Sequence, residues 1–234
     1  MSLRIERPEQ HPDTAPSQRG GLSMHGTNAK GKDAMVGFFR EGVLGVMEGA
    51  SVENLDEVLA SEFAAQATRF IISFNKKGAI AALPTDLSCL LLVESVQVWR
   101  VEVGSSLWTL PRLNDADLFD VGAIAPLGRP MPALRAMTLA GSKTTALPED
   151  LDQAANLESI VMRDVALKAL PECVGRLHAL RTLDIVGALR MRKLPSSMNT
   201  PLLSKLVLQA VGPTTIVVPW QAELEARIKS AGAQ

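Results

Sequence analysis

An internal repeat constrains the fold of this chain more than any other feature of its sequence. Each copy carries the pattern apolar-x-x-apolar-x-apolar, which begins at Leu134, Leu157, Leu180 and Leu203, a step of 23 residues each time. A unit of this length cannot bury its apolar face alone, whereas stacked copies bury a continuous core. The pattern therefore predicts a solenoid in which each coil packs against its neighbours.

A Leu-Pro pair accompanies the repeat. The pairs are Leu83-Pro84, Leu110-Pro111, Leu147-Pro148, Leu170-Pro171 and Leu194-Pro195, with Val218-Pro219 as a degenerate copy. Each apolar pattern is typical of a short strand, and proline suits the return segment because no ladder donor is needed there. Pattern and period are those of a leucine-rich repeat. We predict an α/β leucine-rich-repeat solenoid, a short curved parallel sheet, over residues 68–219 in about six coils.

The N-terminal part of the repeat region is less regular. Two further strands are predicted, around Val93, Val96 and Val98 and around Phe70, Ile72 and Phe74. The step from Leu110 to Leu147 is 37 residues, which is too long for one coil. Residues 112–132 therefore hold either an insertion or an atypical repeat, whose strand would match the template at Leu118, Val121 and Ala123.

Both ends of the chain differ from the repeats. Residues 1–33 are rich in Pro, Ser, Gly, Gln and charge, so we expect disorder. Residues 34–67 are predicted to be a helical N-terminal cap: an apolar helix over 34–48, weakened by three glycines, and a second over 51–66 with Ser51 as its N-cap. Residues 220–234 are predicted to be a C-terminal capping helix, beginning at Trp220, and a tail.

Composition narrows the function classes. The formal net charge is -1, which argues against a nucleic-acid partner. The sequence has no run of eighteen apolar residues, so we expect no membrane insertion. Cys89 and Cys173 form no CxxC pair, and with three histidines in the chain we expect neither a metal site nor a cofactor. Cys173 and His178 lack an orienting third group, so we predict that the protein is not an enzyme.

Three acids lie close together in the segment NDADLFD at residues 114–120. Asp115, Asp117 and Asp120 do not match a calcium loop, which needs more oxygen ligands and a turn glycine. We expect a solvated insertion loop that serves in binding.

The residues between the strand core positions are predicted to face the concave side and bind a protein. This row comprises Gln97, Trp99, Thr138, Ser159, Val161, Arg163, Thr182, Asp184, Val186, Lys205, Val207 and Gln209, with Ser95, Ala136 and Ala140 beside them. Trp99 and Arg163 are of the types that anchor interfaces, although Trp99 is core if the register slips by one residue. A second candidate is a basic edge of Lys143, Lys168, Arg190, Arg192 and Lys193, which either attracts an acidic partner or phosphate or is a solvated edge.

The turns after the strands lack one common feature of such repeats. Many leucine-rich repeats place an asparagine three residues after the last strand leucine. Here the positions hold Ser142, Val165, Ala188 and Val211. We expect the backbone groups at these turns to bond one another or water.

Two segments carry a family resemblance. The stretch LRTLDIVGALRMRKLPSSM at 180–198 resembles plant-type intracellular leucine-rich-repeat proteins. The ending TIVVPWQAELEARI at 215–228 is similar to the closing strand and helix of the repeat domain in XopL-type effectors, which are type III effectors of plant-pathogenic bacteria. Judged from the positions of the repeats, the resemblance covers roughly residues 68–230, and about the last hundred residues match well.

The resemblance implies a secreted effector that reaches the host cell through type III secretion and binds a host protein. The first 33 residues would then be an uncleaved secretion signal. XopL-type effectors carry a ubiquitin-ligase domain after the repeats, whereas this sequence stops at Gln234, so no ligase activity is expected. Two alternatives stay open: the substrate-recognition module of a split or truncated ubiquitin ligase, with a ligase component as partner, and a cytosolic adaptor.

Overall fold

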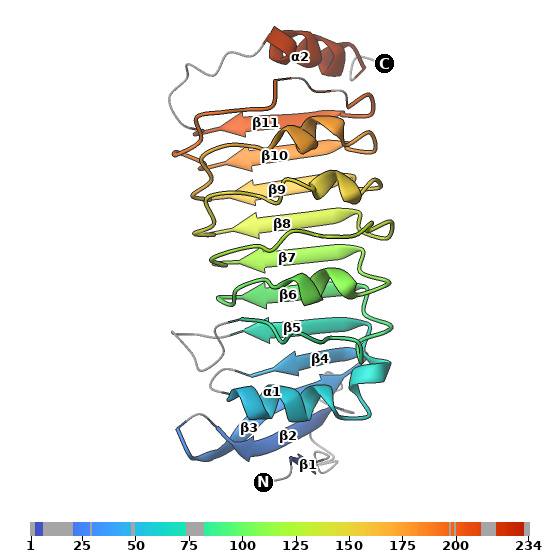
Figure 1. The fold of residues 1–234 in the computed structure, drawn as a ribbon, viewed down its shortest axis with the longest axis vertical. Helices are drawn as coiled ribbons and strands as arrows, with labels where there is room; N and C mark the ends of the chain where they lie inside the picture. Colours follow the sequence, from blue (N-terminus) through green and yellow to red (C-terminus); the bar gives the residue numbers. More distant parts are fainter. Residues whose placement is uncertain are drawn as a thin grey trace, which may run out of the picture. The chain divides into compact units, whose positions relative to one another are not determined.

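The computed structural model describes residues 3–6, 21–28, 30–47, 50–73, 82–196, 198, 200–211 and 219–231. The chain divides into two compact units, residues 1–113 and 114–234. Figure 1 shows the short strands following one another along the chain, with few helices. The described residues form an α/β structure of mostly parallel strands, which is compatible with a solenoid.

The first unit holds β1 (Arg4–Glu6), β2 (Leu22–Thr27), β3 (Asp33–Arg40), β4 (Val43–Val46), β5 (Arg69–Ser73) and β6 (Ser95–Trp99). Strands β1 to β4 pair antiparallel in sequence order. From β4 onward the pairing is parallel, first with β5 and then with β6. The sheet of this unit thus changes from hairpins to repeat-like coils at β4.

The predicted helix over 34–48 is wrong, because these residues form β3, a tight turn and β4. Glu41 and Gly42 turn the chain with φ values of 50° and 77°, a geometry typical of a two-residue hairpin. Val36 and Leu44 are fully buried on the inner face of this hairpin. The three glycines weaken a helix here, and the β-branched and aromatic residues between them favour strands.

Disorder is also wrong for two parts of residues 1–33, which form β1 and β2. Strand β2 pairs with β3 from Leu22 opposite Phe39 to Thr27 opposite Asp33, and Met24 is fully buried. Composition alone misses this because the partner strand supplies the backbone hydrogen bonds and the apolar cover. Residues 7–20 lie outside the described residues.

The second predicted helix is confirmed over part of its range, as α1 (Val52–Leu59) followed by a 3-10 turn, η2 (Ala64–Gln66). Ser51 is its N-cap: the Asn54 backbone N–H donates to Ser51 Oγ at 3.2 Å, and the Ser51 backbone N–H donates to Asn54 Oδ1 at 2.9 Å. Leu55 and Val58 are buried, and α1 contacts β2 and β3. The helix thus covers the hairpin strands.

The second unit holds β7 (Asp115–Phe119), β8 (Ala136–Ala140), β9 (Ser159–Arg163), β10 (Thr182–Val186) and β11 (Lys205–Gln209). These strands pair parallel, in sequence order and without a register shift. Return segments carry 3-10 turns, η4 (Leu151–Gln153) and η5 (Glu172–Arg176), as does η3 (Ser105–Thr109) in the first unit. The predicted strand positions of the repeats beginning at Leu134, Leu157 and Leu180 are buried, as are the leucines of all five Leu-Pro pairs.

Residues 112–132 contain β7, which pairs in parallel with β8, and this favours the atypical repeat over an insertion. Its apolar template is Leu113, Ala116 and Leu118, all fully buried, so the predicted start at Leu118 is five residues too late. The short side chain of Ala116 fills a core position that the expected pattern reserved for a larger residue. The segment 114–120 is therefore largely a strand, and the predicted binding loop is wrong.

A left-handed residue ends the strands of the second unit. The positions are Asp120, Gly141, Asp164, Gly187 and Ala210, with φ between 50° and 79°. The backbone N–H of Gly187, for example, donates to the Gln209 carbonyl of the next coil at 3.0 Å. The expected backbone bonding at the turns is confirmed, as in the 3.0 Å bond from Ala166 N–H to the Ser142 carbonyl, and the Ser142 hydroxyl adds a 2.9 Å bond to Val121.

The C-terminal helix is confirmed as α2 (Pro219–Ala231). Trp220 Nε1 donates a hydrogen bond to the Pro195 carbonyl at 2.8 Å, which ties the start of α2 to the preceding coil. Phe74 and Val218, two predicted repeat positions, lie outside the described residues. Neither described helix combines the length and apolar character required to cross a membrane.

Candidate protein-binding surfaces

The outward-pointing strand residues of the second unit form what we call the open face. They are Asp115, Asp117, Phe119, Ala136, Thr138, Ala140, Ser159, Val161, Arg163, Thr182, Asp184, Val186, Lys205, Val207 and Gln209. On β8, three half-buried residues alternate with two buried ones, and the same pattern holds on β7 and β9. Because the strands are in register, the outward residues stand in three rows across the sheet.

The structure places the predicted concave row in outward positions on its strands. In the first unit, Ser95 and Gln97 are half-buried and Trp99 is 36% exposed, so the register did not slip. Asp184 is the exception in the second unit, with a relative exposure of 4%. Sequence reasoning missed Asp115, Asp117 and Phe119, although the Leu113-x-x-Ala116-x-Leu118 pattern would have located them.

Asp184 joins three strands of the open face through its charge. Arg163 Nη1 and Nη2 donate to its two carboxylate oxygens at 2.6 and 2.8 Å. Lys205 Nζ approaches Asp184 Oδ2 at 3.1 Å from the other side. Both cations stand diagonally to Asp184, since Val161 and Val207 are its direct register partners on β9 and β11.

This arrangement holds the pKa of Asp184 down to about 2. The largest cause is the hydrogen bonding from Arg163, and the contact with Lys205 lowers the pKa further, while burial opposes both. The bidentate geometry also fixes the Arg163 guanidinium, whose side chain remains 39% exposed. The open face therefore presents an arginine that is already oriented.

Charged residues also stack at the edge where the strands of the second unit begin. We call Arg135, Glu158 and Arg181, which directly precede β8, β9 and β10, the start edge. Arg135 Nη1 lies 2.6 Å from Glu158 Oε1, and Arg181 Nε lies 3.5 Å from Glu158 Oε2. The signs alternate, so each arginine has a carboxylate beside it.

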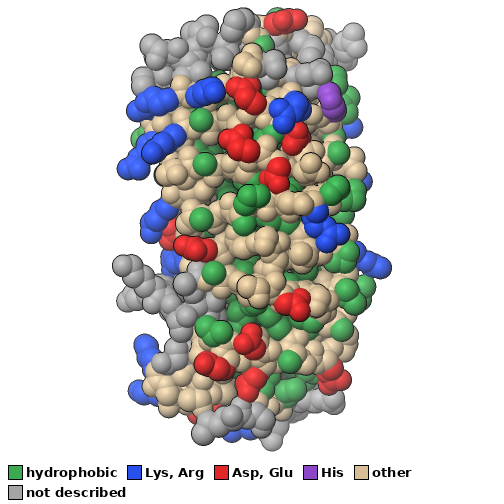
Figure 2. Space-filling view, viewed as in Figure 1, with side chains coloured by type: hydrophobic (Ala, Val, Ile, Leu, Met, Phe, Trp, Pro, Cys, Tyr) green, Lys and Arg blue, Asp and Glu red, His purple; other side chains and the backbone are tan. Residues whose placement is uncertain are grey.

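The opposite edge carries the predicted basic residues, and we keep the name basic edge for Lys143, Lys168, Arg190, Arg192 and Lys193. All of them are exposed. Figure 2 shows a group of Lys and Arg side chains along the edge where the strand arrows of Figure 1 end, and others elsewhere on the unit. Asp and Glu side chains gather over the middle of the same view. The 2.7 Å backbone hydrogen bond from Arg192 to Lys168 places two of the basic residues on neighbouring coils, and binding by the basic edge stays a prediction.

Carboxylates accompany only part of the basic edge. Lys143 Nζ lies 3.7 Å from Asp120, and Lys193 Nζ lies 3.7 Å from Glu172. Arg192 Nη1 donates to the Leu189 and Met191 carbonyls at 2.9 and 3.0 Å, which fixes its guanidinium.

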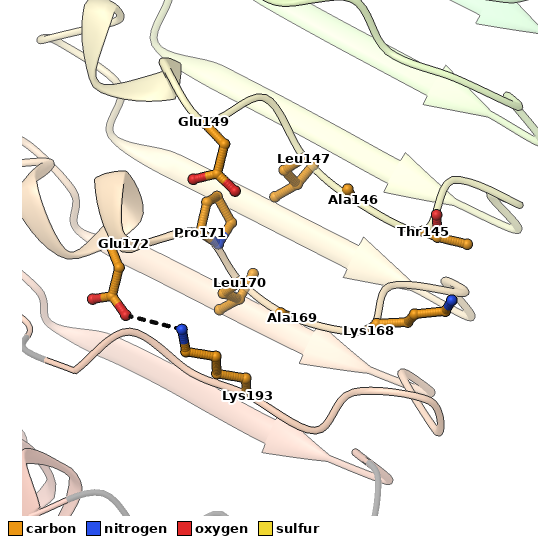
Figure 3. Close-up of a pocket in the computed structure, with 10 residues that line it drawn as sticks. All are labelled: Thr145, Ala146, Leu147, Glu149, Lys168, Ala169, Leu170, Pro171, Glu172 and Lys193. Atoms are coloured by element: carbon orange, nitrogen blue, oxygen red, sulfur yellow. Dashed lines mark ion pairs between the residues drawn. The ribbon is translucent and has the colours of Figure 1, made fainter.

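A pocket of about 160 Å³ lies between the return segments of neighbouring coils (Figure 3). Its lining comprises Thr145, Ala146, Leu147, Glu149, Lys168, Ala169, Leu170, Pro171, Glu172 and Lys193. Glu149 and Glu172 lie toward one end, beside the 3-10 turns, and Lys168 lies toward the end nearest the strand tips. Leu147, Leu170 and Pro171 supply apolar lining between the charges.

The Cys173 thiol is poorly suited to act as a nucleophile. Cys173 is buried, its Sγ donates to the Pro148 carbonyl at 3.5 Å, and burial raises the pKa of the thiol. His178 is exposed, in a different environment. In the described part of the chain, no group of three or more His, Cys, Asp or Glu residues is placed to hold a metal ion.

Comparison with known proteins yielded no family model that matches the chain and no match among curated proteins.

Proposed function

We propose that the chain is a leucine-rich-repeat solenoid that binds another protein through the open face and catalyses no reaction. The observation that carries this proposal is the in-register array of half-exposed strand side chains across β7 to β11. A preformed sheet surface loses little conformational entropy when a partner docks on it.

The chemistry of the open face suits a protein partner. Val161 and Val207 flank the buried Asp184 in the middle row, and β8 offers the small side chains of Ala136, Thr138 and Ala140. Interfaces combine a partly apolar centre with oriented arginines, and Arg163 is held in place by Asp184. The surface therefore offers shape and one anchoring cation rather than a reactive group.

We further propose that the partner is a host protein and that the chain is a secreted bacterial effector. Support comes from the similarity of residues 215–228 to the closing strand and helix of XopL-type effectors, together with the helix at Pro219–Ala231. The same similarity supports the alternative of a substrate-recognition module for a ubiquitin ligase. A cytosolic adaptor would use the same surface with another partner.

The proposal is tested by retention of proteins from plant-cell extract on immobilised protein, comparing wild type with Thr138→Arg. Thr138 lies at the centre of β8 on the open face, so an arginine there obstructs docking without entering the core. Ala155→Arg is the matched control, since Ala155 is exposed outside the strands. Loss of a specific partner with Thr138→Arg, but not with Ala155→Arg, supports the proposal. Equal retention by all three proteins contradicts it.

A further inference from the structure

Two cations of the basic edge are stacked directly on neighbouring coils. The Arg192 backbone N–H donates to the Lys168 carbonyl at 2.7 Å, and the Lys168 backbone N–H donates to the Thr145 carbonyl at 3.1 Å. Like charges on adjacent strands or coils repel each other. Among the described residues, neither Lys168 nor Arg192 has a carboxylate within ion-pair distance.

Several other cations of the same unit are paired with carboxylates. Arg163 and Lys205 share Asp184, Arg176 Nη2 lies 2.7 Å from Asp152, and the start edge alternates in sign. Lys168 and Arg192 differ from these paired cations, because they follow each other on neighbouring coils with no carboxylate beside them among the described residues. An anionic group that docked between Lys168 and Arg192 would relieve their repulsion and gain two charge-assisted contacts.

The pocket adds an apolar element beside this pair. Lys168 belongs to the lining of the pocket, next to Leu147, Leu170 and Pro171 (Figure 3). Leu189, 65% exposed, precedes the basic run of Arg190 and Arg192. A ligand that reaches from the edge into the pocket therefore meets cations first and an apolar surface next.

We propose that the basic edge and this pocket bind an acidic peptide segment of a partner protein, with carboxylates at Lys168 and Arg192 and an apolar side chain in the pocket. A nucleic acid fits less well, because Leu147, Leu170 and Pro171 line the pocket beside the cations and favour an apolar side chain over a second phosphate. The inference goes beyond the proposed function, since it uses another surface and stands even if the open face binds nothing.

The test is fluorescence anisotropy with a labelled peptide, Glu-Asp-Leu-Asp-Glu, titrated with the full chain. We expect measurable binding that weakens as salt is raised, and a loss of at least about tenfold in affinity for the double variant Lys168→Glu, Arg192→Glu. The matched control is Arg129→Glu, an exposed arginine of the same unit outside the basic edge, which should leave the affinity unchanged. Circular dichroism confirms that each variant is folded.

Three further probes distinguish the classes of ligand. A peptide with serine in place of leucine should bind several-fold more weakly, because it leaves the pocket unfilled. A single-stranded RNA oligonucleotide and inorganic pyrophosphate serve as anionic probes without an apolar side chain. The proposal is overturned if the wild type does not bind the peptide, if Arg129→Glu weakens binding as much as the double variant, or if the RNA binds more tightly than the peptide.

Discussion

Charged residues stack on neighbouring coils at both the start edge and the basic edge of the second unit, but the order of positive and negative charges differs between the two edges. Backbone hydrogen bonds of 2.8 Å join Arg135, Glu158 and Arg181 from coil to coil, and a bond of 2.7 Å joins Lys168 and Arg192. At the start edge the charges alternate, and at the basic edge two cations follow each other on neighbouring coils. Stacking of coils therefore brings repeat-equivalent residues together, and the sequence decides whether the contact is attractive.

The difference separates a surface that stabilises the protein from one suited to a ligand. An alternating ladder gains a small Coulomb energy in the folded state alone. A like-charge stack gains nothing from folding, but it attracts an anionic partner. The open face lies between these edges. There Asp184 is paired with Arg163 and Lys205, and the other side chains around it are neutral.

The largest expected effect concerns the turns that follow the strands toward the basic edge. A Cβ at Gly187 would collide with the Asp164 side chain and lie 3.1 Å from its Cα, whereas a Cβ at Gly141 would meet nothing within 4 Å. Both glycines have positive φ. We expect Gly187→Ala to lower the free energy of unfolding by about 3 kcal/mol and Gly141→Ala by about 1 kcal/mol. Equal losses in urea denaturation would contradict this difference.

The next effect concerns the charge cluster of the open face. Asp184→Asn should lower the free energy of unfolding by about 2 kcal/mol, because it removes a nearly buried charge that Arg163 and Lys205 both contact. Thr182→Ser, an outward position on the same strand, is the control and should cost less than about 0.5 kcal/mol. Similar losses for both variants in urea denaturation would show that the cluster contributes little.

The same cluster predicts a pH dependence. The folded-state pKa of Asp184 is lowered from 3.8 to about 2, so its contribution to stability is complete above the unfolded value and is lost as pH falls toward 2. The stability difference between wild type and Asp184→Asn should therefore shrink from about pH 5 downward. Urea midpoints measured at several pH values test this, and a difference that stays constant down to pH 2 would contradict the assigned cause.

The smallest effects concern the charged side chains of the start edge and the basic edge. Glu158→Lys places three cations in one stack and should lower the free energy of unfolding by about 1 kcal/mol. Lys168→Glu replaces a like-charge stack with an opposite-charge pair and should raise the free energy of unfolding by about 0.3 kcal/mol. Thermal denaturation at low and high salt measures both, and the same sign for both variants would refute the distinction between the edges.

The sequence predicted the second unit better than the first. Its template repeats at a fixed step, so burial at Leu134, Leu157 and Leu180 and the outward row were predictable from periodicity alone. The hairpin β3–β4 was not, because a glycine-interrupted apolar run fits a weak helix as well as two short strands. Only the pairing with β2 and the turn at Gly42 decide between them.

The candidate sites show the same limit. Periodicity placed Lys168 and Arg192 in one stripe, but the absence of a neighbouring carboxylate among the described residues is visible only in three dimensions. The burial of Asp184 was also missed, because an outward strand position normally leaves a carboxylate in solvent. Diagonal contacts between strands, which a linear pattern does not encode, bring Arg163 and Lys205 to it.

The most direct test of the proposed protein-binding function is site-specific photocrosslinking in plant-cell extract. A photoreactive amino acid replaces Thr138 on the open face in one protein and Ala155, exposed outside the strands, in another. If the partner docks on the open face, the probe at 138 crosslinks to one discrete host protein and the probe at 155 does not. Crosslinks of equal yield to the same protein from both positions, or none from position 138, would contradict binding through the open face.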